Sequence, residues 1–434
     1  MRPLLVLFGI LLLSQLSISQ LTAQEQDSMD WDIDTIFDLP LEDSQAETDN
    51  EKPAAEETKP AGQEASVIQT LHQRGYSFNA SYLLQFGFLP GWINRPWDDD
   101  WDSEAYYLDR AVRMRSTFGI DARISEVFSV RSVVYFEIPV FRFNLGNFYF
   151  DYNFFDTVFF RGGKYSQSWG ISPNFGFTNL LARIPKGGSS SDSFIFKADL
   201  PIGTGGLQAL ALTRANLVNS SSLVKLNEFG FGGKYNLAQR HADFDLGVFY
   251  QEAMPLRAFL SAKTTILDTE VYNEWLIAVD LEDPSSTNGA VNIGFEREFF
   301  NRKFNVNGEL FYNAEKETYW YEPGSSIRDA STNLFVEGFN IALNLLYRPG
   351  WKGNPRIFLR TLYAPMQESL QLIPGFRLSP LRHIELYFAT PMALGSRDGF
   401  YYANTVRKDN AGQPLPFSVM LLLTLSGSVQ AGHY

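Results

Sequence analysis

After the first 75 residues, apolar and polar side chains alternate along the chain in segments of strand length. In "YSFNASYLLQFGFLP", residues 76–90, aromatic or aliphatic groups recur at every second position, with Ser77, Asn79, Ser81 and Gln85 between them. Because successive side chains of a β-strand point to opposite faces, this segment predicts a strand with one apolar face and one mostly polar face.

The same alternation recurs and predicts an all-β fold of eighteen strands, with sixteen as the alternative count. No helix-period segment of useful length interrupts the series. Tight turns such as Ser125-Glu126 alternate with longer loops, and this pattern, with an even strand count, is typical of an antiparallel transmembrane β-barrel of the bacterial outer membrane. The predicted strands are 76–90, 106–124, 127–141, 146–152, 157–168, 192–200, 206–214, 227–237, 242–252, 256–266, 269–280, 289–299, 304–314, 332–348, 355–363, 369–378, 383–391 and 415–425.

The charge pattern indicates which face of each strand meets lipid. The apolar faces are nearly uncharged, whereas the opposite faces carry Ser, Asn, Gly, Gln and scattered Arg and Glu. A soluble sandwich or barrel, the alternative, would place Lys and Glu outside. Because Arg or Lys at the bilayer midplane costs about 2–4 kcal/mol, we assign the apolar faces to lipid, with Arg110 and Arg297 near strand ends. Eighteen strands enclose water, so a channel or a plugged transporter is predicted.

The first 75 residues differ in composition from the rest. Residues 1–23 combine Arg2, an apolar run and small residues near Ala23, which is the layout of a signal peptide cleaved before Gln24; a retained anchor is the alternative. Residues 24–65 contain 14 acidic residues and 2 lysines, so their net charge is 2 − 14 = −12 of the total −13. A segment this acidic and rich in Pro and Ala cannot bury enough surface to fold.

We therefore divide the chain into a signal peptide (1–23), an acidic, largely disordered periplasmic segment (24–75) and an outer-membrane barrel (76–434). Within the acidic segment, residues 29–39 interleave apolar and acidic side chains. They form either a short docking element or part of an unstructured arm.

Cysteine and histidine usage limits the chemistry. The absence of cysteine excludes disulfides, thiolate metal sites, a thiol nucleophile and a lipidated N-terminal Cys. The four histidines, His72, His241, His383 and His433, are predicted at the short-turn side, away from the rim where a barrel hydrolase needs its nucleophile and base. No His pair has metal-ligand spacing, and the Gly-rich stretches lack the context of a phosphate loop. We expect no enzyme, no cofactor and no metal.

Strand parity places two sets of charged side chains on the inner face. The predicted basic set is Arg113, Arg115, Arg123, Arg131 and Arg161. The predicted acidic set is Asp243, Asp245, Glu270, Glu274, Asp280, Glu296, Glu298 and Glu309. The eleventh strand lies opposite the second in an eighteen-strand ring, so we expect an electric field across the pore that orients polar solutes. The alternative is local pairing of the basic residues with Asp109, Asp121 or Glu137.

The segment from Trp169 to Ser191 is rich in Gly, Ser and aromatic residues and poor in charge, which favours packing against a wall. We expect it to fold inward as a constriction loop. The candidate residues of this loop are Trp169, Phe175, Phe177 and Asn179.

Residues 159–185 contain Gly163-Lys164, Trp169-Gly170 and Asn179-Leu180-Leu181. In these elements, which cover under a tenth of the chain, the sequence resembles the strand and loop of carbohydrate- or phosphate-type porins. That family usually has Asn-Pro before the Asn-Leu-Leu element, whereas here Pro173 and Asn174 are displaced. The resemblance implies a porin-like barrel and no particular solute. The Gly162-Gly163 pair indicates a bulge or a close backbone approach.

The sequence therefore predicts an outer-membrane porin for passive diffusion of small polar solutes, with both termini in the periplasm. A plugged or gated uptake transporter that uses residues 29–39 is one alternative, and a surface-exposed adhesin or structural barrel is another. The expected partners are outer-membrane lipid, small polar solutes and the barrel-assembly machinery, without nucleic acid; the oligomeric state is not predicted. The strand 415–425 is followed by a polar tail, "SGSVQAGHY", which departs from the usual terminal strand of such barrels.

Overall fold

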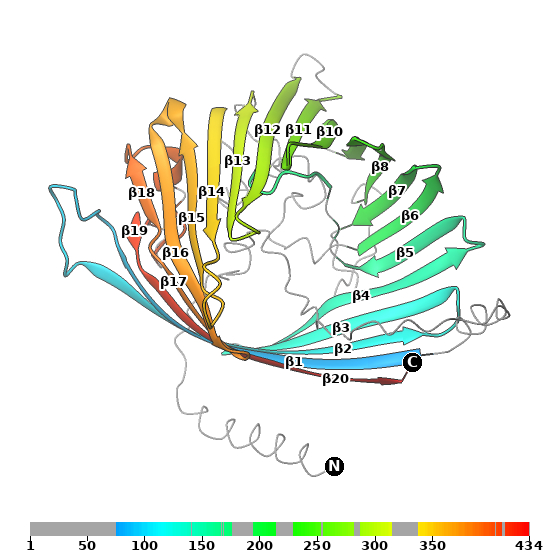
Figure 1. Ribbon diagram of the computed structural model, residues 1–434, viewed down its shortest axis with the longest axis horizontal. Helices are drawn as coiled ribbons and strands as arrows, with labels where there is room; N and C mark the ends of the chain where they lie inside the picture. The colour runs from blue at the N-terminus through cyan, green and yellow to red at the C-terminus, as the bar shows by residue number, and fades with distance from the viewer. Residues whose placement is uncertain are drawn as a thin grey trace, which may run out of the picture. The chain divides into compact units, whose positions relative to one another are not determined.

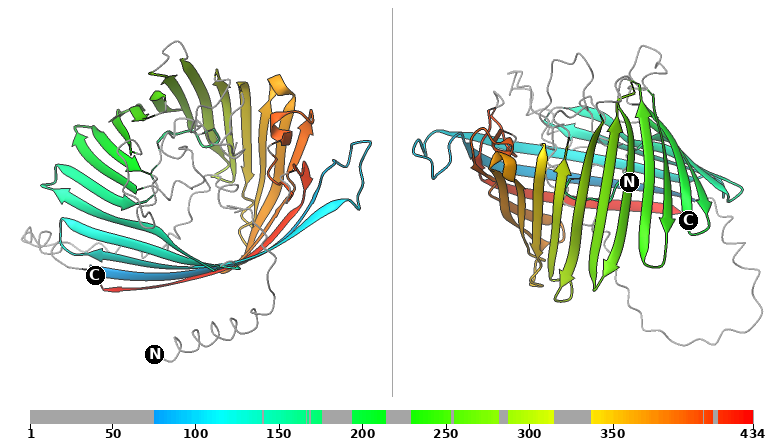
Figure 2. Two further views of the ribbon diagram at one scale, coloured as in Figure 1. Left: turned by 180° about the vertical axis from the view of Figure 1, so that it is seen from behind. Right: turned by 90° about the horizontal axis from the view of Figure 1, so that it is seen from above.

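The computed structural model describes residues 75–139, 141–165, 167, 169–175, 194–213, 229–252, 255–281, 287–314, 337–403, 405–409 and 413–433. These residues form one antiparallel sheet that closes on itself as a barrel of 18 strands (Figure 1 and Figure 2). The predicted signal peptide, the predicted acidic segment up to residue 74, and two of the loop candidates, Phe177 and Asn179, lie outside the described residues.

The barrel contains twenty strand segments, because two of its eighteen strands are each interrupted once: β17 and β18 form one strand, and β19 and β20 form another. β16 pairs with both β17 and β18, and β1 pairs with both β19 and β20. A 3-10 helix, η3 (Pro365–Gln367), and a short helix, α4 (Phe400–Ala403), lie between strands. The strand segments are β1 Gly75–Trp92, β2 Tyr106–Arg123, β3 Phe128–Ile138, β4 Arg142–Phe154, β5 Val158–Lys164, β6 Phe194–Ile202, β7 Gly205–Thr213, β8 Phe229–Ala238, β9 Ala242–Gln251, β10 Leu256–Ile266, β11 Thr269–Val279, β12 Asn288–Phe299, β13 Phe304–Asn313, β14 Gly338–Tyr347, β15 Arg356–Ala364, β16 Ser369–Leu381, β17 Ile384–Ala389, β18 Met392–Gly395, β19 Phe417–Ser418 and β20 Met420–His433.

All eighteen predicted strands have a counterpart, and the differences lie at their ends. β4 begins at residue 142 rather than 146, and its register with β3 shifts between Ser132 and Val134. The tight turns are also found: Leu267 and Asp268 connect β10 to β11 with φ of 51° and 61°. Positive φ at both central residues is the conformation that closes a two-residue hairpin.

The pairing of the first and last strands, which closes the barrel, shows that the prediction for the end of the chain was wrong. β20 does not stop near residue 425; it continues to His433 and pairs with β1 from Tyr76↔His433 to Phe88↔Leu421. The supposed polar tail is therefore strand. Backbone hydrogen bonds to β1 hold residues 426–433 in the sheet. They therefore form strand although they lack the apolar alternation from which the other strands were predicted. The described ends of the chain meet at the short-turn end, where Figure 1 marks the C-terminus beside the start of β1.

The outer surface of the barrel is apolar, as the alternation predicts. Along each strand the side chains on this face are exposed and large, and charge is nearly absent among them. Arg297, one exception, lies near the end of β12 with its guanidinium 4.9 Å from the ring centroid of Phe299. Among the residues with a described conformation, no helix is long and apolar enough to cross a membrane. Representative outward side chains are Phe78, Phe86, Phe118, Phe196, Phe231, Trp275, Ile293, Leu310, Ile341 and Ile357.

Candidate functional site

The chain that follows β5 folds into the barrel and packs against the inner wall. Trp169 and Phe175 are each only 2% exposed and belong to a buried apolar cluster with inward side chains of β6 to β14. Phe175 stacks on Phe311 with ring centroids 4.9 Å apart, and Trp169 lies 5.8 Å from Phe259. Burial of two large aromatic rings on one wall stabilises the inward course of this segment.

Small residues of the wall make room for this segment. A Cβ atom at Gly232 of β8 would lie 2.7 Å from Trp169 Cη2, so a larger residue there would collide with the indole ring. At the start of the segment, Gly163 has φ of 140°, and a Cβ atom there would lie 2.2 Å from the carbonyl oxygen of Phe148. The close backbone approach expected at the Gly162-Gly163 pair is present.

One buried carboxylate binds residues 172–175 of this segment, which we call the inward loop (residues 165–175 as far as described). Glu309 of β13 is 3% exposed. Ser172 Oγ donates to Glu309 Oε2 at 2.6 Å, and the Asn174 amide N donates to Oε1 at 2.9 Å. Within the described part of the chain, the donors to this carboxylate are Ser172 Oγ, the backbone N of Asn174 and Phe175, Asn174 Nδ2, Tyr272 OH and Asn292 Nδ2, all within 3.2 Å.

Further polar contacts fix the loop along its length. The Ile171 amide N donates to Glu274 Oε1 at 2.7 Å, and Glu274 is fully buried. Trp169 Nε1 donates to Gln208 Oε1 at 2.7 Å, and Gln208 Nε2 in turn donates to Asp199 Oδ1 at 2.8 Å. Among the described residues, the loop is therefore held by hydrogen bonds to five strands, β7, β11, β12, β13 and β14, in addition to its apolar contacts.

Two of the residues predicted to line the pore have a different setting. Glu274 and Glu309 point inward, as parity predicts, but the inward loop covers them, so they do not face open lumen. The alternation along a strand predicts only which face a side chain occupies. It cannot predict that residues 171–175, which are distant in sequence, cover Glu274 and Glu309. The partners Gln208, Asn292 and Tyr272 also occupy inward positions, but no local signal identified them as loop contacts.

On the basic wall, three of the five predicted residues form ion pairs with acidic residues of a neighbouring strand. Arg113 and Arg115 both bind Glu137 Oε1 of β3 at 2.7 Å. Arg161 Nε lies 2.6 Å from Asp151 Oδ1, and Arg131 stands opposite Asp121 in the β2–β3 register. The pairing of Arg113 and Arg115 with Glu137 is the local arrangement considered as the alternative to an open basic ladder.

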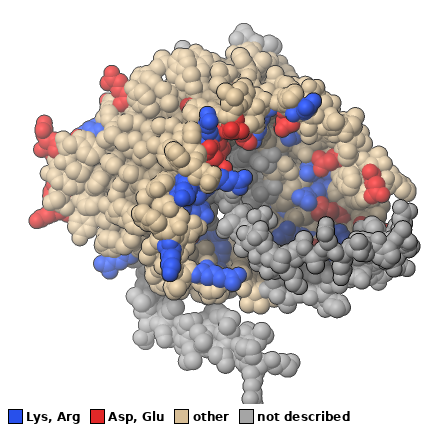
Figure 3. Space-filling model, in the orientation of Figure 1, with Lys and Arg blue, Asp and Glu red and all other residues tan. Residues whose placement is uncertain are grey.

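The acidic wall shows the same tendency. Asp245 pairs with Lys234 at 3.1 Å and Glu270 with Lys263 at 2.6 Å. Glu298 lies 3.2 Å from Arg302 and 3.7 Å from Arg348, and Glu296 accepts a hydrogen bond from Asn305. Asp243 is an exposed residue opposite Lys263, and Asp280 follows the last residue of β11. Figure 3 shows red and blue side chains next to each other in the hollow of the barrel.

The predicted basic set omitted several inward cations. Arg257 on β10 is 2% exposed, and Arg356 and Arg360 on β15 lie on the same strand face, with Arg356 opposite Arg377 of β16. The same parity argument, applied to every strand, would have found them. Basic residues therefore occur on walls beyond β2–β5, and the two signs are less separated than the sequence-based sets suggested.

A cavity of about 330 Å³ lies near the short-turn end of β2–β6. Its lining includes Arg123, Asp151, Arg161, Lys197 and Asp199. Arg161 is fixed in this cavity by Asp151 and by the ring of Tyr149, whose centroid is 4.5 Å from the guanidinium carbon. Charged groups of both signs thus line this cavity.

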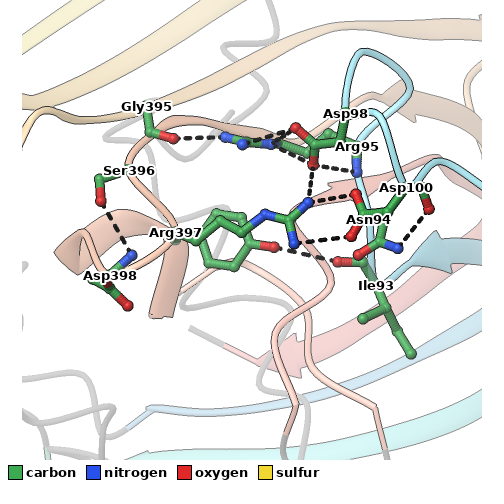
Figure 4. Close-up of polar contacts among 10 residues, drawn as sticks. Ile93, Asn94, Arg95, Asp98, Asp100, Gly395, Ser396, Arg397 and Asp398 are labelled. Carbon is green, nitrogen blue, oxygen red and sulfur yellow. Dashed lines mark hydrogen bonds and ion pairs between the residues drawn. The ribbon is translucent and has the colours of Figure 1, made fainter.

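At the opposite, long-loop end, two loops are joined by the arginine–aspartate clasp, formed by Arg95, Asp98, Asp100 and Arg397 (Figure 4). Arg95 Nε donates to Asp98 at 2.9 Å and its Nη1 donates to the carbonyl oxygen of Gly395 at 2.8 Å. Arg397 lies 3.1 Å from Asp98 Oδ2 and 3.0 Å from Asp100 Oδ2. The clasp connects the β1–β2 loop to the loop that carries α4.

The α4 loop also reaches the barrel wall. The Tyr401 amide N donates to Ser369 Oγ at 2.8 Å, and Tyr401 itself is 4% exposed. Tyr402 OH donates to the carbonyl oxygen of Ile93 at 3.3 Å. The clasp thus ties the tip of the β1–β2 hairpin, through α4, to the inner face of β16.

The pKa values of both aspartates of the clasp, Asp98 and Asp100, are lowered, which favours the charged carboxylate. Burial raises the pKa of Asp98, but its hydrogen bonds to the Arg95 side chain and backbone outweigh burial, and its pKa lies below the ordinary 3.8. The hydrogen bond from Arg397 holds the pKa of Asp100 below 3.8 as well. A carboxylate with a lowered folded-state pKa contributes stability above its ordinary pKa and loses it as the pH falls through the lowered value.

We therefore expect the clasp to stay closed at neutral pH and to open only below about pH 4, near the ordinary value for Asp. A spin label on Asp99→Cys, which would be the only cysteine in the chain, should become mobile over that range. Arg397→Gln should make the label mobile already at neutral pH, whereas Glu104→Gln in the same loop should not. A label equally immobile in Arg397→Gln would contradict the role of the clasp.

Within the described ranges, no group of three or more His, Cys, Asp or Glu side chains is arranged to hold a metal ion. His241 and His383 lie in short turns, as predicted, whereas His433 is the last residue of β20 rather than part of a tail.

No protein-family model matches the chain, and no curated protein matches it. Solved structures do match. OpdQ of Pseudomonas aeruginosa is 8% identical with a TM-score of 0.53, covering 82% of this chain and 98% of that one. OccK11 (OpdR) of the same organism is 9% identical with a TM-score of 0.52, covering 82% and 96%. OccK3 (OpdO) is 11% identical with a TM-score of 0.51, covering 81% and 96%. At this identity the likeness concerns the fold, and the chain shares the barrel fold of these Occ-type outer-membrane porins.

Proposed function

We propose that this protein is an outer-membrane channel through which small polar solutes diffuse passively. The observation that carries the proposal is the inward loop: a segment anchored by Glu309 and Glu274 on the inner wall of a barrel whose outer face is apolar. A loop fixed inside a wide barrel narrows the path without filling it, which suits selection by size and polarity. The proposed process involves no chemical reaction.

The charged inner residues have distinct roles in this proposal. The basic residues Arg113, Arg115, Arg123, Arg131 and Arg161 line one wall, and the acidic residues Asp243, Asp245, Glu270, Asp280, Glu296 and Glu298 line the other. Glu274 and Glu309 position the loop instead. Because most of these charges have a neighbour of opposite sign, we expect a lumen that orients dipolar solutes and discriminates modestly between anions and cations.

The orientation in the membrane is part of the proposal. The short-turn end, where the described ends of the chain meet, would face the periplasm, as is usual for barrels with short turns on that side. Insertion would then depend on the barrel-assembly machinery.

Reconstitution tests the function directly. In planar bilayers the purified protein should give discrete single-channel conductance steps, and liposomes that contain it should swell in small sugars faster than in larger ones. Protein-free liposomes and heat-denatured protein are the controls. A folded barrel that inserts but neither conducts nor causes swelling would contradict a channel function.

A further inference from the structure

Three neighbouring turns at the short-turn end form one continuous surface. They are the turns β12–β13 (300–303), β14–β15 (348–355) and β16–β17 (382–383). The Arg348 amide N donates to the carbonyl oxygen of Lys303 at 2.6 Å, and Arg348 Nη1 donates to that of Arg302 at 3.1 Å. The Ser379 amide N donates to the carbonyl oxygen of Gly353 at 2.8 Å, which joins the end of β16, just before the third turn, to the second turn.

These turns carry basic residues and no acidic residue. The basic turn surface consists of Arg302, Lys303, Arg348, Lys352 and Arg382. Figure 3 shows Lys and Arg side chains gathered around the lower ends of β14–β17, where these turns lie in Figure 1. The remaining short turns differ: those of β2–β3, β4–β5 and β10–β11 contain Glu126, Asp156 and Asp268, and only that of β8–β9 contains an arginine, Arg240. Positive charge is therefore concentrated on one third of the rim.

Most of this charge has no acidic partner. Arg302 and Arg348 share the single carboxylate of Glu298. Lys303, Lys352 and Arg382 form no ion pair within the described part of the chain, and all three are exposed. Cations crowded together without partners repel one another, so an anion placed among them would be stabilised.

The same turns expose apolar side chains beside the cations. Phe300 is 78% exposed, Trp351 68%, and Leu381, the last residue of β16, 63%. Aromatic side chains at this height suit the boundary between lipid tails and headgroups. Basic and apolar side chains therefore lie next to each other at the edge of the lipid-facing surface. This arrangement is complementary to a lipid that has an anionic headgroup and apolar chains.

We propose that the basic turn surface binds the phosphate headgroup of an anionic phospholipid in the leaflet at the short-turn end, with Trp351 and Phe300 against its glycerol and upper acyl region. The inference rests on the membrane placement in the proposed function and not on transport. Lys and Arg bind phosphate oxygens by charge-assisted hydrogen bonds, and juxtamembrane basic clusters recognise anionic lipids.

Native mass spectrometry of the intact barrel tests the site with phosphatidylglycerol and phosphatidylcholine as probes. The unaltered protein should retain phosphatidylglycerol preferentially. The triple variant Lys303→Gln/Lys352→Gln/Arg382→Gln should lose at least tenfold in retention, given roughly fivefold per basic residue. Arg240→Gln, in a separate short turn, should retain the lipid like the unaltered protein. The single variant Lys352→Gln should show a partial loss even if the triple variant folds poorly, as judged by circular dichroism.

Several outcomes would overturn the proposal. Equal retention of phosphatidylglycerol in the folded triple variant would show that the surface does not bind it, and equal loss in Arg240→Gln would show only diffuse electrostatics. Displacement of the lipid by excess inorganic phosphate would point to a soluble anion instead. A barrel that retains the lipid but does not conduct would contradict the channel function and leave this site intact.

Discussion

Replacing Glu309 by Gln should release the inward loop and raise single-channel conductance. The carboxylate accepts hydrogen bonds from six donors among the described residues, three of them on the loop backbone or on Ser172. A glutamine amide removes one acceptor oxygen and introduces an NH₂ group that faces those donors. Leaving a buried hydrogen-bond donor without an acceptor costs about 1–3 kcal/mol, and several donors would be affected, so we expect the loop to leave the wall for much of the time.

The measurement is conductance in planar bilayers, with opening and closing noise as a second readout. Asp245→Asn is the matched control, because Asp245 also lies on the inner face but contacts Lys234 rather than the loop. Unchanged conductance in a folded Glu309→Gln barrel would show that Glu309 does not hold the loop in the path of ions.

Replacing Arg113 and Arg115 together by Gln should shift the reversal potential toward cation selectivity. The two guanidinium groups share one carboxylate, Glu137, so the cluster has a charge of 2 − 1 = +1. The double variant changes this to 0 − 1 = −1 and leaves Glu137 facing the lumen without its partners. Because the pair is partly exposed, the loss in stability should stay near 1 kcal/mol.

Arg110→Gln provides the control, since Arg110 lies on the same strand with its side chain on the outer face. That variant should leave selectivity unchanged. If the double variant and Arg110→Gln had the same reversal potential as the unaltered channel, the basic residues of β2 would have no part in ion selection.

The sequence by itself was sufficient for the architecture. Strict alternation, as in Phe78 to Phe88, reports which face of each strand meets lipid, because lipid rejects charge at every depth of the membrane core. The contrast between tight turns and long loops then orders the strands, since antiparallel neighbours in a meander pair with their sequence neighbours. These signals are local, so they can be read without the partner strand.

Only the tertiary structure decided the end of the last strand, the seating of the loop and the pairing of charges. Residues 426–433 lack an apolar alternation. They form strand because they pair with the backbone of β1. Ser172 and Glu309 are far apart in sequence, so the alternation along β13 could not predict that the inward loop covers Glu309. Arg113 and Arg115 meet Glu137 through the register of β2 and β3. The β1–β20 pairing depends on closure of the barrel, the loop contacts join segments that are distant in sequence, and the charge pairs depend on strand register, so no single segment carries that information.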